Sequence, residues 1–153
     1  MEHYLRHYRA LHARWPRPFD GIPEVLHFLK SQGVLVGLVT GKGPKSLPMT
    51  LEQFGLSGIF EVVKAGEIKG PVKARQIREV ISEYSLDPGH VVYVGDSTAD
   101  ILASRQCAIG SVAAAWAPTT DVAALQRLKP DYLFTTVPEF REFVEKRYLQ
   151  QQR

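Results

Sequence analysis

The chain has 153 residues, 44% of them hydrophobic and 23% charged, which is the composition of one soluble globular domain. No apolar run approaches the ~20 residues that a membrane helix needs, and no signal peptide precedes the first charged residues, so we expect a cytoplasmic protein without a membrane partner. The net charge of +3 suits anionic ligands such as phosphate esters, and the basic residues do not interleave with aromatic ones as a nucleic-acid groove requires.

Helical and strand patterns alternate along the chain. A helix is expected at residues 4–14, where Pro16 and Pro18 end it, and a second one at 22–32, with Gly33 just past its end. Further helices are expected at 46–54, 73–84, 101–106, 121–128 and 138–149. Strands are expected at 34–40, 60–64, 91–94 and 131–135, and an apolar run lies at 111–116. This alternation predicts βαβ units and an α/β fold with a doubly wound, mostly parallel sheet.

The single cysteine, Cys107, excludes an internal disulfide and fits a reducing compartment. It lies in a helical stretch with no histidine nearby in the sequence. A buried, small hydrophobic side chain is therefore favoured over a nucleophile at this position.

The first candidate site follows the strand at 34–40 and consists of Thr40, Gly41 and Lys42. A hydroxyl and free backbone N–H groups in a glycine-containing loop form an anion-binding nest for phosphate. One alternative is a dinucleotide fingerprint, Gly41-x-Gly43-x-x-Ser46, which lacks the third glycine and an acidic residue at the end of the following strand. The other is a βα turn that needs glycine only for its backbone angles.

The second candidate is Lys73, which opens the helix expected at 73–84. A lysine at a helix N-terminus is unfavourable for the helix dipole, and this local conflict points to a functional reason for the residue. An exposed lysine tolerates the conflict easily, however. Lys69, four residues earlier, is the alternative phosphate-binding lysine.

The third candidate is the pair Asp96 and Asp100, which follows the strand at 91–94. In open α/β sheets, ligands bind at the carboxyl ends of the strands. Hard oxygen ligands with this spacing suit Mg²⁺, which takes one or two protein carboxylates and leaves its other positions to water and phosphate. The alternative is a capping box from Ser97 to Asp100 that only starts the next helix.

Taken in this order, the motifs resemble those of the haloacid dehalogenase (HAD) superfamily, and most closely its phosphoglycolate-phosphatase-like hydrolases. The resemblance covers residues 16 to about 140, and the separation of Lys73 from Asp96 suits the family better than that of Lys69. It implies a Rossmann-like core at residues 18–153, preceded at 1–17 by the remnant of a helical cap domain. Acting on small phosphate esters through Mg²⁺-assisted phosphoryl transfer is the function that it implies.

On the phosphate side, the resemblance implies that Thr40 and the Gly41 amide hold phosphate oxygens. Lys73 would offset the developing negative charge, and Lys42 would contact the phosphate or the leaving part of the substrate. Ser97 is counted with these substrate-binding residues.

On the metal side, the resemblance implies that Asp96 and Asp100 bind Mg²⁺. Asp96 would be the direct ligand, whereas Asp100 would orient Lys73 or the waters of the metal. Thr40, Lys73 and Asp96 form the implied catalytic set.

One departure from the family is as important as the match. The family's first motif, Asp-x-Asp on a central strand, supplies the nucleophile and the general acid/base, and this sequence contains no Asp-x-Asp pair. We therefore expect an N-terminally truncated core with very low or no turnover. The alternative is a catalytically silent domain that binds phosphate and metal or serves in interactions.

The missing strand would lie between the strands at 34–40 and 91–94. Neighbouring strands lie ~4.8 Å apart, so a vacant central position leaves two rows of backbone groups without partners. The remaining strands must close up, borrow a strand from elsewhere, or form a poorly stable domain. An exposed strand edge would also favour a homodimer.

Overall fold

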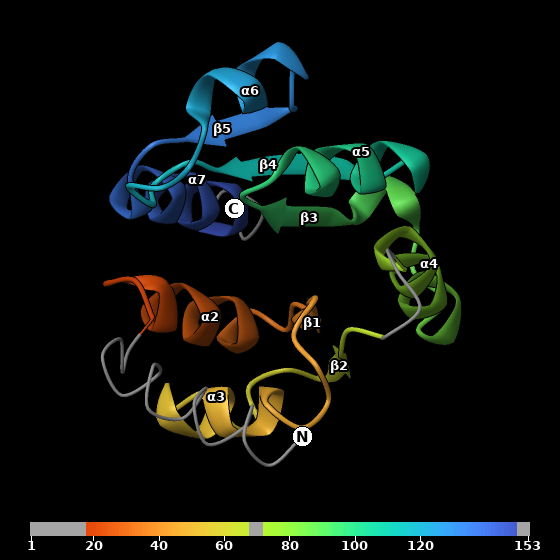
Figure 1. Ribbon diagram of the computed structural model, residues 1–153. Coiled ribbons are helices and arrows are strands. Elements are labelled where there is room, and N and C mark those ends of the chain that lie inside the picture. The colour runs from red at the N-terminus through yellow and green to blue at the C-terminus, as the bar shows by residue number, and fades with distance from the viewer. Residues whose placement is uncertain (1–17, 68–71, 150–153) are drawn as a thin grey trace. The chain divides into compact units, whose positions relative to one another are not determined.

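The computed structural model of the chain describes residues 18–67 and 72–149 (Figure 1). The backbone divides between Pro71 and Val72 into two compact units. The helix expected at 4–14, the cap remnant at 1–17 and Lys69 lie outside the described residues. The domain boundary expected between residues 17 and 18 therefore stays a prediction.

The first unit contains α2 (Ile22–Ser31), β1 (Gly37–Val39), α3 (Leu47–Gln53) and β2 (Val62–Lys64). β1 and β2 pair in parallel, with Gly37 opposite Val62 and Val39 opposite Lys64. The parallel direction places the loops that follow both strands at the same edge of this sheet, as the alternating pattern predicts.

The second unit contains a three-stranded parallel sheet in the order β3–β4–β5. Figure 1 shows the helices that connect its strands. Its elements are α4 (Lys73–Glu83), the 3₁₀ turn η1 (Pro88–His90), β3 (Val92–Gly95), α5 (Thr98–Gln106), β4 (Gly110–Ala114), α6 (Val122–Arg127), β5 (Tyr132–Phe134) and α7 (Val137–Leu149).

Alternate residues of β4 and β5 face opposite sides of this sheet. On one side Ala113 packs with Ile101 of α5 and Leu125 of α6 in a buried cluster. On the other side, the ring of Phe134 lies 5.7 Å from that of Phe140 and 5.2 Å from that of Phe143, both on α7. Helices therefore cover both faces, and the α/β fold class predicted from the alternation is confirmed.

Hydrogen bonds attach α4 to the end of α5. The thiol of Cys107 donates to the carbonyl of Ala74 at 3.3 Å, and the guanidinium of Arg78 donates to the carbonyl of Gln106 at 3.2 Å. Cys107 is buried, and this burial raises the pKa of its thiol. The interpretation of Cys107 as a buried side chain is thus confirmed.

The described strands form two parallel sheets, one in each unit. Among the described residues, β1 pairs only with β2, and β3 pairs only with β4. The three outcomes expected for a vacant central position, in which the remaining strands close up, borrow a strand or form a poorly stable domain, stay predictions.

Strands β1, β2, β4 and β5 are shorter than the apolar runs that predict them, whereas β3 has the predicted length. The run at 34–40 yields only Gly37–Val39, because its first residues serve other partners. The N–H of Val34 donates to the carbonyl of Leu29 at the end of α2, and the N–H of Val36 donates to the carboxylate of Glu61 at 2.8 Å.

None of the helices in the described ranges has both the length and the apolar character required to cross a membrane.

Shortening a buried side chain of α5 should lower the stability of the second unit, whereas shortening the exposed side chain next to it should not. Ile101 is 1% exposed, whereas Leu102 is 44% exposed. We expect Ile101→Ala to lower the free energy of unfolding by about 2–5 kcal/mol, because it leaves a cavity beside Ala113 and Leu125. Leu102→Ala should change it by less than about 0.5 kcal/mol. Urea unfolding of both variants measures the difference, and equal losses would contradict the assigned core.

Candidate functional site

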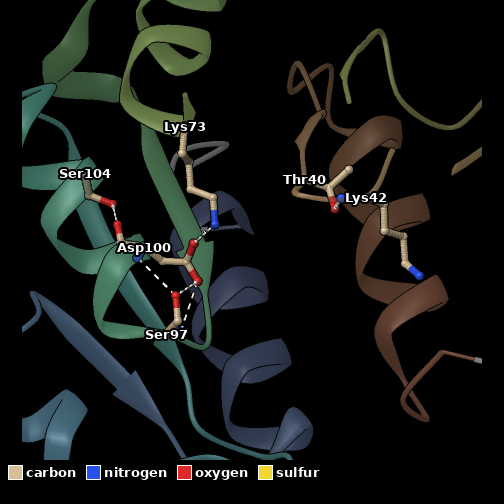
Figure 2. A network of polar contacts seen from close by, with 6 residues as sticks. All are labelled: Thr40, Lys42, Lys73, Ser97, Asp100 and Ser104. Carbon is tan, nitrogen blue, oxygen red and sulfur yellow. Dashed lines mark hydrogen bonds and ion pairs between the residues drawn. The ribbon is translucent and has the colours of Figure 1, made fainter. Parts of the chain in front are cut away.

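In the loop after β1, hydrogen bonds fix the position of Thr40 and of its hydroxyl oxygen. The N–H of Thr40 donates to the carbonyl of Lys64 at 3.1 Å and extends the pairing of β1 with β2 by one residue. The N–H of Lys42 donates to the Thr40 hydroxyl oxygen at 3.2 Å (Figure 2). Accepting from Lys42 uses a lone pair of that oxygen and not its proton, which a hydroxyl can still donate to an acceptor such as a phosphate oxygen.

Two further groups of this loop suit an anion. Gly41 is exposed, and within the described ranges its N–H has no protein acceptor. Lys42 is half-buried, and the desolvation lowers the pKa of its ammonium group. A bound anion would offset that desolvation. The three residues that the sequence places in a phosphate nest are therefore together and carry suitable donors.

In the second unit, the end of β3 leads directly into α5. Asp96 is exposed, and Ser97 is the N-cap of the helix. The Asp100 carboxylate oxygen Oδ2 accepts from the backbone N–H of Ser97 at 3.0 Å and from the Ser97 hydroxyl at 2.9 Å. The Ser97 hydroxyl in turn accepts from the N–H of Asp100 at 3.2 Å. The capping box considered as an alternative is present, and substrate binding by Ser97 stays a prediction.

The other oxygen of the same carboxylate, Asp100 Oδ1, forms an ion pair with the ammonium of Lys73 (Figure 2). The Asp100 side chain is 5% exposed and that of Lys73 is 29% exposed. Lys73 is the first residue of α4, and its ammonium extends to a carboxylate at the start of α5. The unfavourable position of a lysine at a helix N-terminus is thus matched by a carboxylate partner. Because Lys69 lies outside the described residues, the choice between Lys73 and Lys69 as the phosphate-binding lysine stays a prediction.

Gly95 makes room for the buried carboxylate. An ideal Cβ at Gly95 would lie 2.3 Å from Cγ of Asp100, so a side chain there would displace the carboxylate. Behind Asp100, the buried hydroxyl of Ser104 donates to its backbone carbonyl at 2.8 Å. The glycine that ends β3 therefore determines where Asp100 and its partner Lys73 lie.

Tyr93 is a member of this site that the sequence analysis missed. The ammonium of Lys73 lies 5.9 Å from the centre of the Tyr93 ring, within the range of a cation–π contact. Burial, and then the charges of Asp100 and Asp96, raise the pKa of the Tyr93 phenol, which therefore stays protonated at neutral pH. The available signal was its position on a strand of otherwise aliphatic residues, directly before the two carboxylates.

The carboxylates of this site differ in what they offer to a metal. Both oxygens of Asp100 accept from protein donors, whereas the described part of the chain provides no donor to the Asp96 carboxylate. Among the described residues, no group of three or more His, Cys, Asp or Glu side chains is placed to hold a metal ion. A cation that keeps most of its water and takes one protein carboxylate, as Mg²⁺ does, fits Asp96.

The predicted site residues thus form two groups. Thr40, Gly41 and Lys42 lie together in the first unit. Lys73, Asp96, Ser97 and Asp100 belong to the second, where the ion pair and the capping box connect three of them. The approach of the two groups to a common ligand stays a prediction.

Residues 1–114 match the haloacid dehalogenase-like hydrolase family. The chain is 30% identical to a phosphoglycolate phosphatase of Synechococcus elongatus over 128 residues, which cover 82% of the chain and 58% of the relative. It is 33% identical to one of Agrobacterium fabrum, covering 85% of the chain and 56% of the relative. A pyrophosphatase of Halalkalibacterium halodurans is 24% identical, with coverages of 92% and 66%.

Solved structures agree on the fold. A haloacid dehalogenase-like hydrolase from Streptococcus pneumoniae superposes with a TM-score of 0.73 at 22% identity, covering 82% of this chain and 59% of that one. A HAD-superfamily hydrolase from Geobacter sulfurreducens gives a TM-score of 0.64 at 24% identity, covering 82% and 55%. The chain therefore spans less than two thirds of the proteins that it resembles in these comparisons.

The two carboxylates should respond differently to loss of charge. Asp100→Asn replaces an acceptor of Lys73 and Ser97, and we expect it to lower the free energy of unfolding by about 1–3 kcal/mol. Asp96→Asn, at an exposed position on the same turn, should change it by less than about 0.5 kcal/mol. Urea unfolding without added metal measures both values. A larger loss for Asp96→Asn than for Asp100→Asn would contradict the assigned roles.

Proposed function

The chain belongs to the haloacid dehalogenase-like hydrolase family, and we propose that it provides the phosphate- and metal-binding part of a phosphatase core. The observation that carries the proposal is the arrangement after β3, where Asp100 is bound to Lys73 and Ser97 while Asp96 is exposed. Small phosphate esters are the proposed substrates, since the relatives include phosphoglycolate phosphatases and a pyrophosphatase.

On the phosphate side, Thr40 donates its hydroxyl proton and Gly41 its backbone N–H to phosphate oxygens. Lys42 contacts the phosphate or the leaving part of the substrate. Lys73 offsets negative charge as it develops on the phosphoryl group. Each of these groups is a donor or a cation, which matches the charge of the ligand.

On the metal side, Asp96 is the proposed direct ligand of Mg²⁺. When bound, this ion offsets charge on the phosphoryl oxygens and orients the phosphate. Asp100 acts through other groups, because its two oxygens hold Lys73 and the start of α5. The same carboxylate thus positions the lysine on one side and the turn that carries Asp96 on the other.

The proposal includes very low turnover by this chain alone. Phosphoryl transfer in the family requires a nucleophilic aspartate, and the 153 residues contain no Asp-x-Asp pair. The same absence supports a second candidate function, a catalytically silent domain that binds phosphate and Mg²⁺. The dinucleotide alternative at Gly41-x-Gly43 is not part of the proposal, since the match is to a hydrolase family.

Binding of inorganic phosphate with and without Mg²⁺ tests the proposal. Calorimetric titration should give saturable binding that weakens when EDTA removes the metal. Thr40→Ala should weaken phosphate binding roughly tenfold, as expected for loss of one hydrogen bond to a charged group. Thr40→Ser keeps the hydroxyl and should retain most of the affinity.

Two results would contradict the proposal. One is the absence of saturable phosphate binding by the unmodified chain at millimolar concentration in the presence of Mg²⁺. The other is equal affinity of the Thr40→Ala variant and the unmodified chain, which would place the phosphate elsewhere.

A further inference from the structure

We propose that Gly66, in the loop after β2, is a positioning residue for the phosphate-binding loop after β1. The inference rests on the proposed function, because it takes Thr40 and Gly41 as the groups that hold phosphate. It adds a residue that touches no substrate and acts through the backbone of its neighbours. What the position requires is the absence of a side chain.

The two loops meet closely at Gly66. An ideal Cβ there would lie 2.2 Å from the carbonyl oxygen of Gly41, 2.6 Å from its carbonyl carbon and 3.1 Å from its Cα. All three atoms belong to the backbone, so no side chain can turn aside to make room. The φ angle of Gly66 lies outside the left-handed region, so close approach, and not backbone freedom, is the reason for glycine.

A hydrogen bond holds the same contact from the other side. The N–H of Gly66 donates to the carbonyl of Lys42 at 2.7 Å. The carbonyl oxygens of Gly41 and Lys42 therefore both lie against the loop after β2. Carbonyl oxygens repel an anion, so keeping them there leaves the donors of the β1 loop for a phosphate.

The hydroxyl of Thr40 depends on the same arrangement. Lys42 donates its N–H to the Thr40 oxygen at 3.2 Å while its carbonyl accepts from Gly66. A shift of the Gly41–Lys42 peptide would move that N–H and change the direction of the Thr40 proton. Gly66 thus affects phosphate binding through the orientation of the Thr40 hydroxyl.

Gly43, two residues after Gly41, provides a matched control for the substitution of Gly66. An ideal Cβ at Gly43 meets nothing within 4 Å, and its carbonyl accepts from the N–H groups of Ser46 and Leu47 near the start of α3. Gly43→Ala therefore adds the same methyl group to the β1 loop without a collision.

The experiment compares Gly66→Ala with Gly43→Ala in titrations of inorganic phosphate with Mg²⁺, after circular dichroism has shown that both variants fold. Gly66→Ala should raise the dissociation constant roughly tenfold, as expected when binding groups are misplaced. Gly43→Ala should change it by less than about threefold. Equal dissociation constants for the two variants would overturn the assignment.

A double-mutant cycle separates positioning of Thr40 from a general structural effect. If Gly66 acts through Thr40, adding Gly66→Ala to Thr40→Ala should raise the dissociation constant by less than about threefold. An undiminished tenfold loss in that background would show that Gly66 acts elsewhere, and would overturn the proposal.

Amide hydrogen exchange tests the role of Gly66 in the two cases in which the phosphate titration cannot. If the unmodified chain does not bind phosphate, the proposed function fails. The role of Gly66 is then tested by the hydrogen-exchange rate of the Lys42 N–H, which should be faster in Gly66→Ala than in the unmodified chain. An unchanged rate would overturn the assignment. If Gly66→Ala does not fold, hydrogen exchange of the unmodified chain alone tests the contact of Gly66 with Lys42. Its Gly66 N–H should be protected from exchange, and an unprotected Gly66 N–H would overturn the contact.

Discussion

The carboxylate of Asp100 is the constraint on which the site of the second unit depends. It is buried, and its charge is matched by the ammonium of Lys73 and by two donors of Ser97. A buried carboxylate is costly unless such partners are present, and removing one of them leaves the charge uncompensated. Gly95 adds a steric condition, because only a residue without a side chain allows Asp100 to lie against the end of β3.

This dependence explains why the two carboxylates after β3 have different tasks. Both carboxylate oxygens of Asp100 bond to protein groups, one in the capping box that begins α5 and the other in the ion pair with Lys73. Asp96 is exposed on the turn that this network fixes, and no donor from the described part of the chain bonds to its carboxylate. A buried carboxylate that organises the turn beside an exposed one is the arrangement that the proposed phosphate and metal site requires.

Much of this organisation was readable from the sequence. The alternation of apolar runs and helical patterns predicted the parallel α/β fold, and the spacing from Ser97 to Asp100 predicted the capping box. The metal site expected from Asp96 and Asp100 stays a prediction. Tyr93 and Gly66 could not be predicted, because each gains its meaning from a neighbour distant in sequence: Lys73 for the tyrosine, and Gly41 for the glycine. The pairing of the strands into a two-stranded and a three-stranded sheet also depends on long-range contacts, which local patterns do not determine.

Hydrolysis of an aryl phosphate by the unmodified chain, with Mg²⁺ and beside an Asp96→Ala variant, is the decisive measurement. If the chain carries phosphate- and metal-binding groups without a nucleophile, as proposed, we expect no Mg²⁺-dependent rate above that of the variant. Mg²⁺-dependent turnover that disappears in Asp96→Ala would contradict the proposal, since a group other than the aspartate of an Asp-x-Asp pair would then perform the phosphoryl transfer.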